Sequence, residues 1–234
     1  MTAAVHGRSA RPVQGEASRP PDERAARLTG VVARAPEVHR GVTEFTLAGE
    51  TRMPGGVVLP WYHKVLTDDP RAAKLVMAGQ ALAVEGDLDH HKFGPVGARK
   101  SLVRVVARHV RTVEIRPEER LVCGSVTDVS FRLAESASVN EVRPAGNLTQ
   151  AAEASLTSLD EPLVRLNLAA EGSGGRTHYF LLKAWRAQTA GLDALRRGAR
   201  LGVVGVLISE SYPDAVTGQK RNAVLVEVLR SRTC

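Results

Sequence analysis

Aromatic and basic side chains recur at matching positions in the two halves of this sequence. In the first half, Tyr62 and Lys64 alternate on one predicted strand. In the second half, the same alternation places on one strand Tyr179, Lys183 and Trp185. Because successive side chains of a strand point to opposite faces, the members of each set share one face. An exposed ring beside a cation can stack a nucleic-acid base and hold its phosphate.

The apolar residues of each strand indicate which face points outward. We expect His63 and Val65 to point into the interior of the first unit, which leaves Tyr62 and Lys64 outside. In the second unit the inward-facing set is Phe180, Leu182 and Ala184. Trp61 lies on the opposite face from Tyr62. For Trp61 and for each outer ring, the alternative role is to fill a barrel interior or a subunit contact.

A second aromatic residue lies at the end of the fourth predicted strand in each half. The candidate binding residues of these two predicted hairpins are Lys92, Phe93, Arg99 and Lys100 in the first half and Tyr212, Lys220 and Arg221 in the second. Only 4% of the residues are aromatic, so their recurrence at matching positions is informative. Stacking of a base on a ring contributes about 1–3 kcal/mol and tolerates any base sequence. The pattern therefore favours sequence-tolerant binding of single-stranded nucleic acid.

No arrangement of residues predicts catalysis, a cofactor or a metal site. His90 and His91 are adjacent, so their rings point to opposite faces of a strand and cannot share one metal ion. Asp69 precedes Pro70 and indicates a helix cap. The glycine-rich residues 172–175 lack the lysine and the following helix of a phosphate-binding loop. We therefore expect a protein that is not an enzyme.

The chain is a tandem duplication. Three separated positions recur at one constant spacing, with Gly79, Gly86 and Phe93 matched by Gly198, Gly205 and Tyr212. Each unit has the size of a domain, not of a solenoid repeat. The predicted domains are a flexible basic arm (1–27), a first unit (28–115), a connector (116–138) and a second unit (139–234). Within the connector, residues 121–133 have strand-like alternation and are expected either to pair onto a barrel edge or to lie between the barrels.

Both units have the same predicted order of elements. The first has strands at 28–35, 42–49, 57–66, 81–91 and 100–113, with a helix at 71–77. The second has strands at 139–148, 163–170, 177–185, 200–212 and 220–230, with a helix at 188–197. Five short strands with one helix between the third and fourth is the order of an OB-fold barrel. The expected fold class is all-β, with two tandem five-stranded OB-fold barrels.

The composition is the one expected of a protein that binds a polyanion. The formal net charge is +7 and the sequence pI is about 9.9, which favours partners such as nucleic acid. The two cysteines, Cys123 and Cys234, are too few for a disulfide framework or a zinc site. The sequence contains no apolar run of about 20 residues and no signal-peptide core, so we expect a cytoplasmic protein.

The sequence resembles the bacterial single-stranded DNA-binding proteins, specifically the form with two OB-folds in one chain. The best-matched segments are LPWYHKV (59–65), residues 79–93, NEV (140–142) with GNLT (146–149), and TGQKRN (217–222). The resemblance implies a homodimer in which four OB-folds wrap one strand of DNA. The sequence leaves open whether RNA is a ligand in place of DNA. It also implies stacking roles for the rings of Tyr62, Phe93, Tyr179, Trp185 and Tyr212.

The sequence departs from this family in three places. The first unit has Thr67, Asp68 and Asp69 where the second has Trp185, so one stacking ring is missing, and neither unit has an aromatic residue at the end of its second strand. The sequence ends in LRSRTC (229–234) without the acidic tip of the family. We therefore expect an accessory protein in DNA repair, recombination or replication. The alternative is an OB-fold assembly module that uses the same faces to contact proteins.

Overall fold

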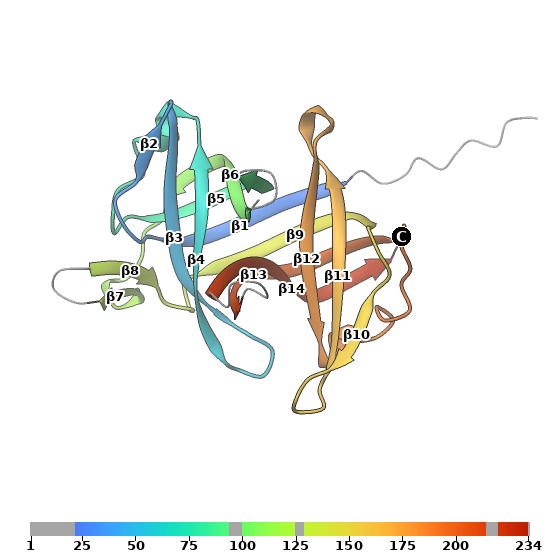
Figure 1. Cartoon of the computed structure of the whole chain (residues 1–234). Coiled ribbons are helices and arrows are strands. Elements are labelled where there is room, and N and C mark those ends of the chain that lie inside the picture. The colour runs from blue at the N-terminus through green and yellow to red at the C-terminus, as the bar shows by residue number, and fades with distance from the viewer. Residues whose placement is uncertain (1–21, 94–99, 125–128, 214–219, 234) are drawn as a thin grey trace, which may run out of the picture.

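Two β-barrels lie side by side in the computed structural model, which describes residues 22–93, 100–124, 129–213 and 220–233 (Figure 1). Their strands belong to one 14-stranded sheet, because the first strand of each barrel is hydrogen-bonded to the first strand of the other. The predicted fold class, all-β with two tandem OB-type barrels, is confirmed. No helix in these ranges has the length and apolar character needed to cross a membrane.

The first barrel contains the five predicted strands. They are β1 (Glu23–Val32), β3 (Val42–Arg52), β4 (Val58–Thr67), β5 (Ala81–Phe93) and β6 (Lys100–Thr112), and the short β2 (Glu37–His39) pairs with β3. The barrel closes where β4 runs parallel to β6 and where β1 passes from β5 onto β3. From β3 onward the strand bounds lie within a few residues of the predicted ones.

The second barrel repeats this arrangement. Its strands are β9 (Val139–Leu148), β11 (Pro162–Glu171), β12 (Thr177–Trp185), β13 (Arg200–Pro213) and β14 (Lys220–Thr233), and the short β10 (Glu153–Leu156) pairs with β11. The one-turn 3-10 helix η2 (Ser173–Gly175) joins β11 to β12. The bounds of β9 and β12 are those predicted from sequence.

The two predicted helices have different outcomes. In the first barrel α1 (Pro70–Ala73) is shorter than predicted, and the side chain of Asp69 caps it by accepting a hydrogen bond from the Arg71 N–H at 2.8 Å. In the second barrel the predicted helix at 188–197 is wrong. A 3-10 turn, η3 (Arg186–Thr189), is followed by Gly191, whose φ of +74° is incompatible with an α-helix.

The first strand begins before its predicted start. Residues 23–27 belong to β1 and not to the predicted arm, whose residues 1–21 lie outside the described ranges. Sequence reasoning places this start too late, because residues 23–28 bury only two apolar side chains, Ala26 and Leu28, although β1 is paired on both sides by β5 and β9. Asp22 fixes its start by accepting hydrogen bonds from the Glu171 N–H at 2.7 Å and from Arg200 at 2.6 Å.

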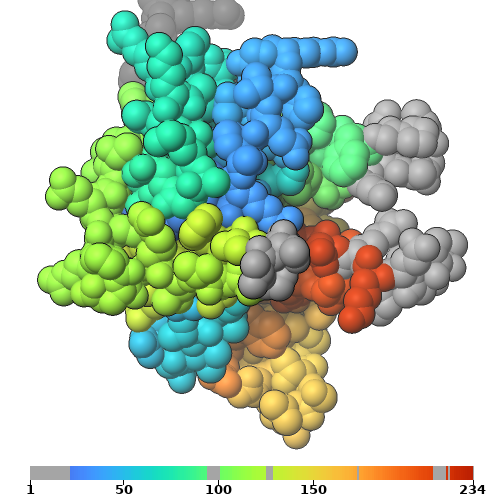
Figure 2. Space-filling model, turned by 90° about the vertical axis from the view of Figure 1, so that its left-hand side faces the viewer, coloured from blue at the N-terminus to red at the C-terminus, as the bar shows by residue number. Residues whose placement is uncertain are grey.

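The connector forms a hairpin on the edge of the first barrel. After η1 (Pro117–Glu119), β7 (Arg120–Gly124) pairs with β8 (Val129–Leu133), and β8 runs parallel to β3 at Gly49 and Leu133. Of the two alternatives for residues 121–133, pairing on a barrel edge is confirmed, although as two strands instead of one. Figure 2 shows this yellow-green hairpin lying across the face of the first barrel.

An approximate two-fold axis relates the barrels. Val32 pairs with Leu47 as Leu148 pairs with Leu168, so β1 and β9 are equivalent and Ala26 corresponds to Val142. Ala26 and Val142 are also paired to each other in the antiparallel β1–β9 ladder. The axis therefore passes between these two buried residues, and the barrels meet in two equivalent interfaces, one on each side of it.

The repeated glycines of β5 and β13 mark matching β-bulges. The strand register shifts between Glu85 and Gly86 in the first barrel and between Val204 and Gly205 in the second. A Cβ atom at Gly205 would lie 2.3 Å from the carbonyl oxygen of Glu227, and one at Gly86 would lie 2.2 Å from that of Val106. The close approach of the neighbouring backbone explains why both repeats have glycine here.

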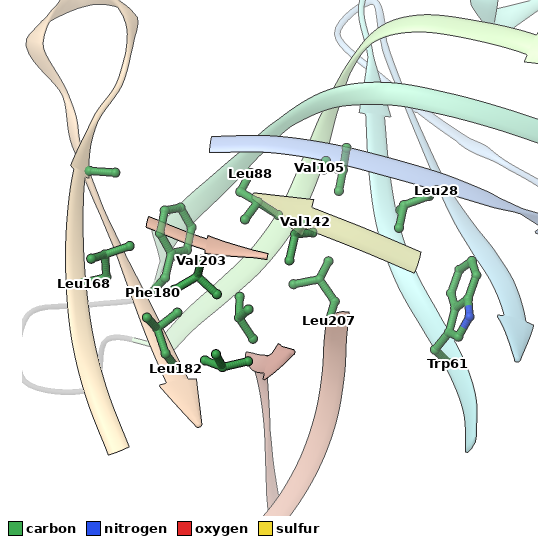
Figure 3. Packing of buried hydrophobic residues seen from close by; sticks show 14 of the residues in the cluster. Leu28, Trp61, Leu88, Val105, Val142, Leu168, Phe180, Leu182, Val203 and Leu207 are labelled. Atoms are coloured by element: carbon green, nitrogen blue, oxygen red, sulfur yellow. The ribbon is translucent and has the colours of Figure 1, made fainter. Parts of the chain in front are cut away.

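The apolar interiors of the two barrels form one continuous cluster (Figure 3). Leu28 and Trp61 lie on the side of the first barrel, Phe180 and Leu182 lie on the side of the second, and Val142 is between them. The inward positions expected for His63, Val65, Phe180, Leu182 and Ala184 are confirmed. Trp61 is buried as well, which supports its alternative structural role.

One of the two equivalent interfaces is uncharged, and we call it the neutral interface. It contains Leu59, Trp61 and His63 of β4 with Asn140, Leu207, Ile208 and Ser209 of the second barrel. Asn140 donates to the Leu207 carbonyl at 2.8 Å and accepts from the Leu207 N–H at 3.0 Å. His63 Nε2 is 3.1 Å from the same carbonyl, and its ring stacks on Trp61 with centroids 5.1 Å apart.

His63 is held in the neutral form. Nε2 serves as the donor to Leu207, and Nδ1 is buried without a hydrogen-bond partner in the described structure. Burial, opposed by the hydrogen bond to Leu207, lowers the pKa of His63 from 6.5 to about 4. The equivalent residue in the second barrel is Phe180, whose ring stacks on His178 in the same way.

We expect Gly205→Ala to lower the free energy of unfolding by about 2–3 kcal/mol, because its Cβ atom would collide with backbone. Gly202→Ala on the same strand is the control. Its Cβ atom would meet the flexible side chain of Arg232 at 3.3 Å, so a change within about 1 kcal/mol is expected. Urea unfolding of both variants measures the difference, and equal losses would contradict the close-approach explanation.

Acid should destabilise the protein through His63. As pH falls from about 6.5 to about 4, the unfolded chain binds a proton at His63 that the folded chain excludes, so stability falls in that window. The shift corresponds to about 3 kcal/mol. In His63→Phe, which introduces the ring of the equivalent Phe180, this part of the pH dependence should disappear. Urea unfolding of both proteins across this pH range tests it, and identical profiles would show that His63 is not responsible.

Candidate nucleic-acid interface

The ring predicted on the third strand of the first barrel is on the surface. Tyr62 is 41% exposed and lies opposite Ala48 across the β3–β4 ladder. Lys64, two residues further along β4, is exposed and pairs with Glu44. Arg132 of β8 pairs with Glu50 at 2.9 Å and interacts with the Tyr62 hydroxyl. The cations closest to this ring therefore each face a carboxylate.

The equivalent strand of the second barrel has a more basic surface. Tyr179 is 45% exposed and lies opposite Ala169. Arg165, which is exposed, occupies the position equivalent to Glu44 of the first barrel. This exchange of a carboxylate for a guanidinium makes the outer face of β11 and β12 the better surface for an anionic strand.

Lys183 does not have the exposure expected for a binding cation. It lies on the predicted face, but only 8% of it is exposed, and it forms an ion pair with Glu210 of β13. The prediction that it is an outward cation beside Tyr179 is wrong, because the carboxylates of Glu210 and Glu227 draw it onto the sheet. Burial, and then the charge of Glu210, raise the pKa of Glu227, while Lys183 opposes them.

Trp185 lines a cleft of about 300 Å³ between the barrels. Met53 and Pro54 of the β3–β4 loop and Leu59 of β4 form one wall, and the ring of Trp185 is on the other wall. The ring is half-buried, and the Lys183 ammonium lies 5.9 Å from its centroid. The cleft leaves part of the indole accessible to a planar ligand.

The two hairpin rings are exposed, Phe93 by 44% and Tyr212 by 47%. Their backbone partners across the ladder are predicted basic residues, Lys100 for Phe93 and Arg221 for Tyr212. Lys92 and Lys220 are exposed nearby, and Arg99 lies outside the described residues.

Tyr179 is bordered by residues of the other barrel, which sequence reasoning missed. The ammonium of Lys92 lies 5.2 Å from the Tyr179 centroid, and the ring of His90 meets Tyr179 edge-on at 6.0 Å. Lys92 and His90 belong to β5 of the first barrel, whereas Tyr179 belongs to β12 of the second. Strand alternation cannot reveal a contact of this kind, because it describes each strand separately.

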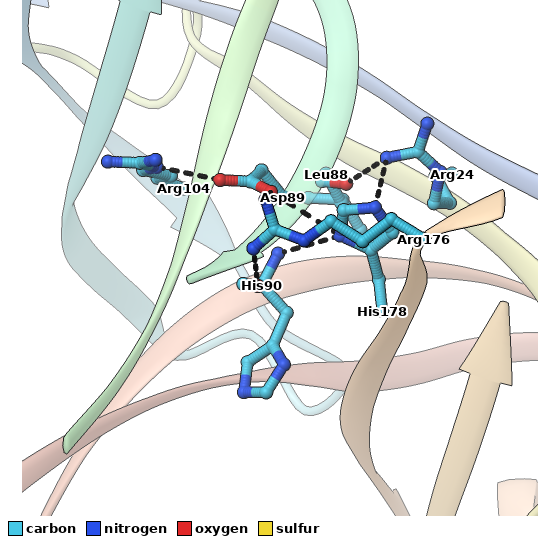
Figure 4. A network of polar contacts seen from close by, with 7 residues as sticks. All are labelled: Arg24, Leu88, Asp89, His90, Arg104, Arg176 and His178. Atoms are coloured by element: carbon cyan, nitrogen blue, oxygen red, sulfur yellow. Dashed lines mark hydrogen bonds and ion pairs between the residues drawn. The ribbon is translucent and has the colours of Figure 1, made fainter. Parts of the chain in front are cut away.

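A polar network holds this contact together (Figure 4). Asp89 accepts from Arg104 at 2.8 Å and lies 3.4 Å from His178 Nδ1. Arg176 donates to the His90 carbonyl at 2.9 Å, and the His90 N–H donates to His178 at 3.1 Å. Arg24 completes the set by donating to the Leu88 carbonyl at 2.8 Å. We call the contact made by Arg24, Asp89, His90, Lys92, Arg104, Arg176 and His178 the charged interface.

Both histidines of the charged interface favour the neutral form. Burial is the first cause that lowers the pKa of His178, followed by the charge of Arg24, and Asp89 opposes them. Burial also lowers the pKa of His90, with further contributions from Lys92 and His178. Burial and the positive neighbours together therefore outweigh the carboxylates of Asp89 and Asp87.

Comparison with known proteins identifies the family. No family model matches this chain. It is 30% identical over 225 residues to a single-stranded DNA-binding protein of Deinococcus radiodurans, covering 87% of this chain and 72% of that relative. The chain belongs to the single-stranded DNA-binding protein family. A single-stranded DNA-binding protein of Thermus thermophilus is 29% identical over 219 residues, covering 87% of this chain and 81% of the relative.

The family assignment extends to the three-dimensional structure. The crystal structure of wild-type single-stranded DNA binding protein from Thermus aquaticus matches with a TM-score of 0.71 at 25% identity, covering 92% of this chain and 94% of that chain. The resemblance predicted from sequence is confirmed. Relatives in this family are named for binding and not for a reaction, in agreement with the expectation that the chain is not an enzyme. The roles of the individual rings and cations stay predictions.

We expect Lys183→Met to destabilise the protein by about 1–3 kcal/mol at neutral pH, because it leaves Glu210 and Glu227 without their cation. The loss should shrink in mild acid, because the raised pKa of Glu227 lets this carboxylate take up a proton there. Lys64→Met removes an exposed pair with Glu44 and should cost less than about 1 kcal/mol. Urea unfolding at neutral and acidic pH compares the two, and a pH-independent loss in Lys183→Met would contradict this account.

Proposed function

We propose that this protein binds single-stranded DNA without strict sequence preference, stacking bases on its exposed rings and holding phosphates with lysine and arginine. The observation that carries the proposal is the exposure of four rings at equivalent positions of the two barrels, which are Tyr62, Phe93, Tyr179 and Tyr212. Single-stranded DNA binding by the named relatives supports it.

The exposure of these rings favours a ligand over a purely structural role. Burial of an aromatic side chain contributes about 1.5–3 kcal/mol, so leaving four rings at the surface forgoes much of that stabilisation. The inward positions of the same strands are occupied by buried side chains, such as Phe180 on β12. A surface that repeats exposed rings beside cations in both barrels suits bases and phosphates together.

The two barrels should contribute unequally. In the first barrel, Lys64 and Arg132 near Tyr62 each pair with a carboxylate. In the second, Tyr179 has Lys92 beside it. The second barrel also has the additional ring of Trp185 in its cleft. We infer that the second barrel provides the larger share of the binding free energy.

We further propose that two copies of the chain associate, so that four barrels line one strand, and that the protein acts in the cytoplasm in DNA repair, recombination or replication. The resemblance to two-barrel members of the family supports the dimer. The mass in solution, measured by light scattering with and without DNA, tests it. A monomer in both conditions would contradict this part of the proposal.

Tryptophan fluorescence offers a direct test, because the chain has two tryptophans and only one lies in the cleft. Adding oligo-dT should quench the emission of Trp185 strongly, and a duplex of equal length should not. In Trp185→Leu the remaining emission, from buried Trp61, should not respond, and the affinity should fall about tenfold with the loss of one stacking ring.

Salt and RNA complete the experiment. The logarithm of the affinity should fall linearly with the logarithm of salt concentration, because bound phosphates release counterions. Oligo-U in place of oligo-dT shows whether RNA also binds. Salt-insensitive binding, a preference for duplex, or no binding at all would overturn the proposal, and no binding would favour a protein-assembly role for the same faces.

A further inference from the structure

The charged interface contains more positive charge than its structural role requires. Arg104 and Arg176 pair with Asp89, whose side chain is almost fully buried, while Arg24 lies against the neighbouring Leu88 carbonyl and Lys92 lies over Tyr179. The other carboxylate nearby in the described part of β5, Asp87, pairs with Arg108 at 3.5 Å. One buried carboxylate is balanced by one cation, so the remaining guanidinium and ammonium groups leave a concentrated positive charge at this point.

The neutral interface shows that the barrels do not need these charges to stay together. The strand pairings give each member of the charged interface an equivalent residue across the two-fold axis. Asn140 is the equivalent of Arg24, and Leu225 is the equivalent of Arg104. Ile208, Ser209 and Ser211 are the equivalents of Asp89, His90 and Lys92. Leu59 and Trp61 are the equivalents of Arg176 and His178. None of these equivalents is charged at neutral pH.

The same backbone contact is thus made with neutral residues on the other side of the axis. Asn140, at the position of Arg24, satisfies both backbone groups of Leu207. Trp61, at the position of His178, packs on His63 and fills the interface. The neutral interface shows that a contact of this kind can form without an ion pair among its described residues, so the exposed cations opposite are available to a ligand as well as to the contact between the barrels.

The accessible cations lie where an anionic ligand could reach them. The Arg176 side chain is 53% exposed, and its guanidinium is oriented by the His90 carbonyl and by Asp89 at 3.7 Å. Lys92 is exposed beside the Tyr179 ring. Arg104 and Arg24 are less exposed than Arg176 and Lys92 and add positive charge beside them. An oriented guanidinium, a mobile ammonium and an adjacent open ring together fit one nucleotide, with its phosphate on the cations and its base on the ring.

We propose that the charged interface is a phosphate-binding site for single-stranded DNA, in which Arg176 and Lys92 contact the phosphate of a nucleotide whose base stacks on Tyr179. This inference rests on the proposed function and adds a position to it. Lys92 comes from the first barrel, and Arg176 and Tyr179 from the second, so the strand passes from one barrel to the other here. The neutral interface offers no such site among its described residues, so the charged interface is the crossing point that the described part of the chain provides.

The double variant Lys92→Gln/Arg176→Gln tests the proposal through the salt dependence of binding. Loss of one phosphate contact should flatten the plot of log affinity against log salt by about 0.7. Affinity for labelled oligo-dT, followed by fluorescence anisotropy, should fall about tenfold at low salt. Arg176→Lys in the otherwise unchanged chain keeps the charge and should retain the salt slope.

Arg143→Gln is the matched control, because Arg143 is 49% exposed, pairs with Glu141, and lies opposite Ala25 on the β1–β9 ladder, on the other face of the sheet from Arg24. Its slope and affinity should stay close to those of the unaltered protein. Thermal unfolding of every variant checks that the barrels remain assembled. A double variant that is folded but keeps the full salt slope would overturn the phosphate site while leaving the proposed function intact. Failure of the unaltered protein to bind oligo-dT would overturn both.

Discussion

The antiparallel pairing of β1 with β9 is the constraint on which the rest of the structure depends. Each of these strands serves its own barrel and joins the other, so the two barrels cannot rotate freely about a linker. The ladder centred on Ala26 and Val142 fixes a two-fold relation, and that relation places β5 against β12 on one side and β4 against β13 on the other. Both interfaces between the barrels follow from this one ladder.

The two interfaces differ in their charge but are packed in the same way. Each contains a pair of parallel stacked rings, Trp61 on His63 in one case and His178 on Phe180 in the other. The histidine occupies opposite positions in the two pairs and is kept neutral by burial in both. The interface of His178 gathers cations around Asp89, and the interface of His63 has none. The exposed rings on the outer faces are similar in the two barrels, so the difference in charge between the two interfaces adds to the difference between Glu44 and Arg165 on the outer faces.

Much of the fold could be predicted from sequence, because alternation reports burial one strand at a time. It located β9 and β12 and assigned the outward positions of Tyr62 and Tyr179. It failed where another element decides the outcome. The start of β1 depends on pairing with two neighbours, Lys183 is drawn in by Glu210 from β13, and Gly191 interrupts a helix that the apolar pattern favours. The charged interface joins β5 to β12, and no periodicity within either strand could indicate it.

Fusion of the two barrels into one polypeptide has an evolutionary consequence. When two identical chains assemble around a two-fold axis, every substitution appears twice, once on each side, so the two contacts must remain alike. After duplication within one chain, the residues on the two sides of the axis are encoded separately, so each side can change without the other. Asp89 can then be retained while its counterpart drifts to Ile208, and Arg176 can arise without altering Leu59. The difference between the two contacts is therefore a property that became accessible to selection only after the gene was duplicated in tandem.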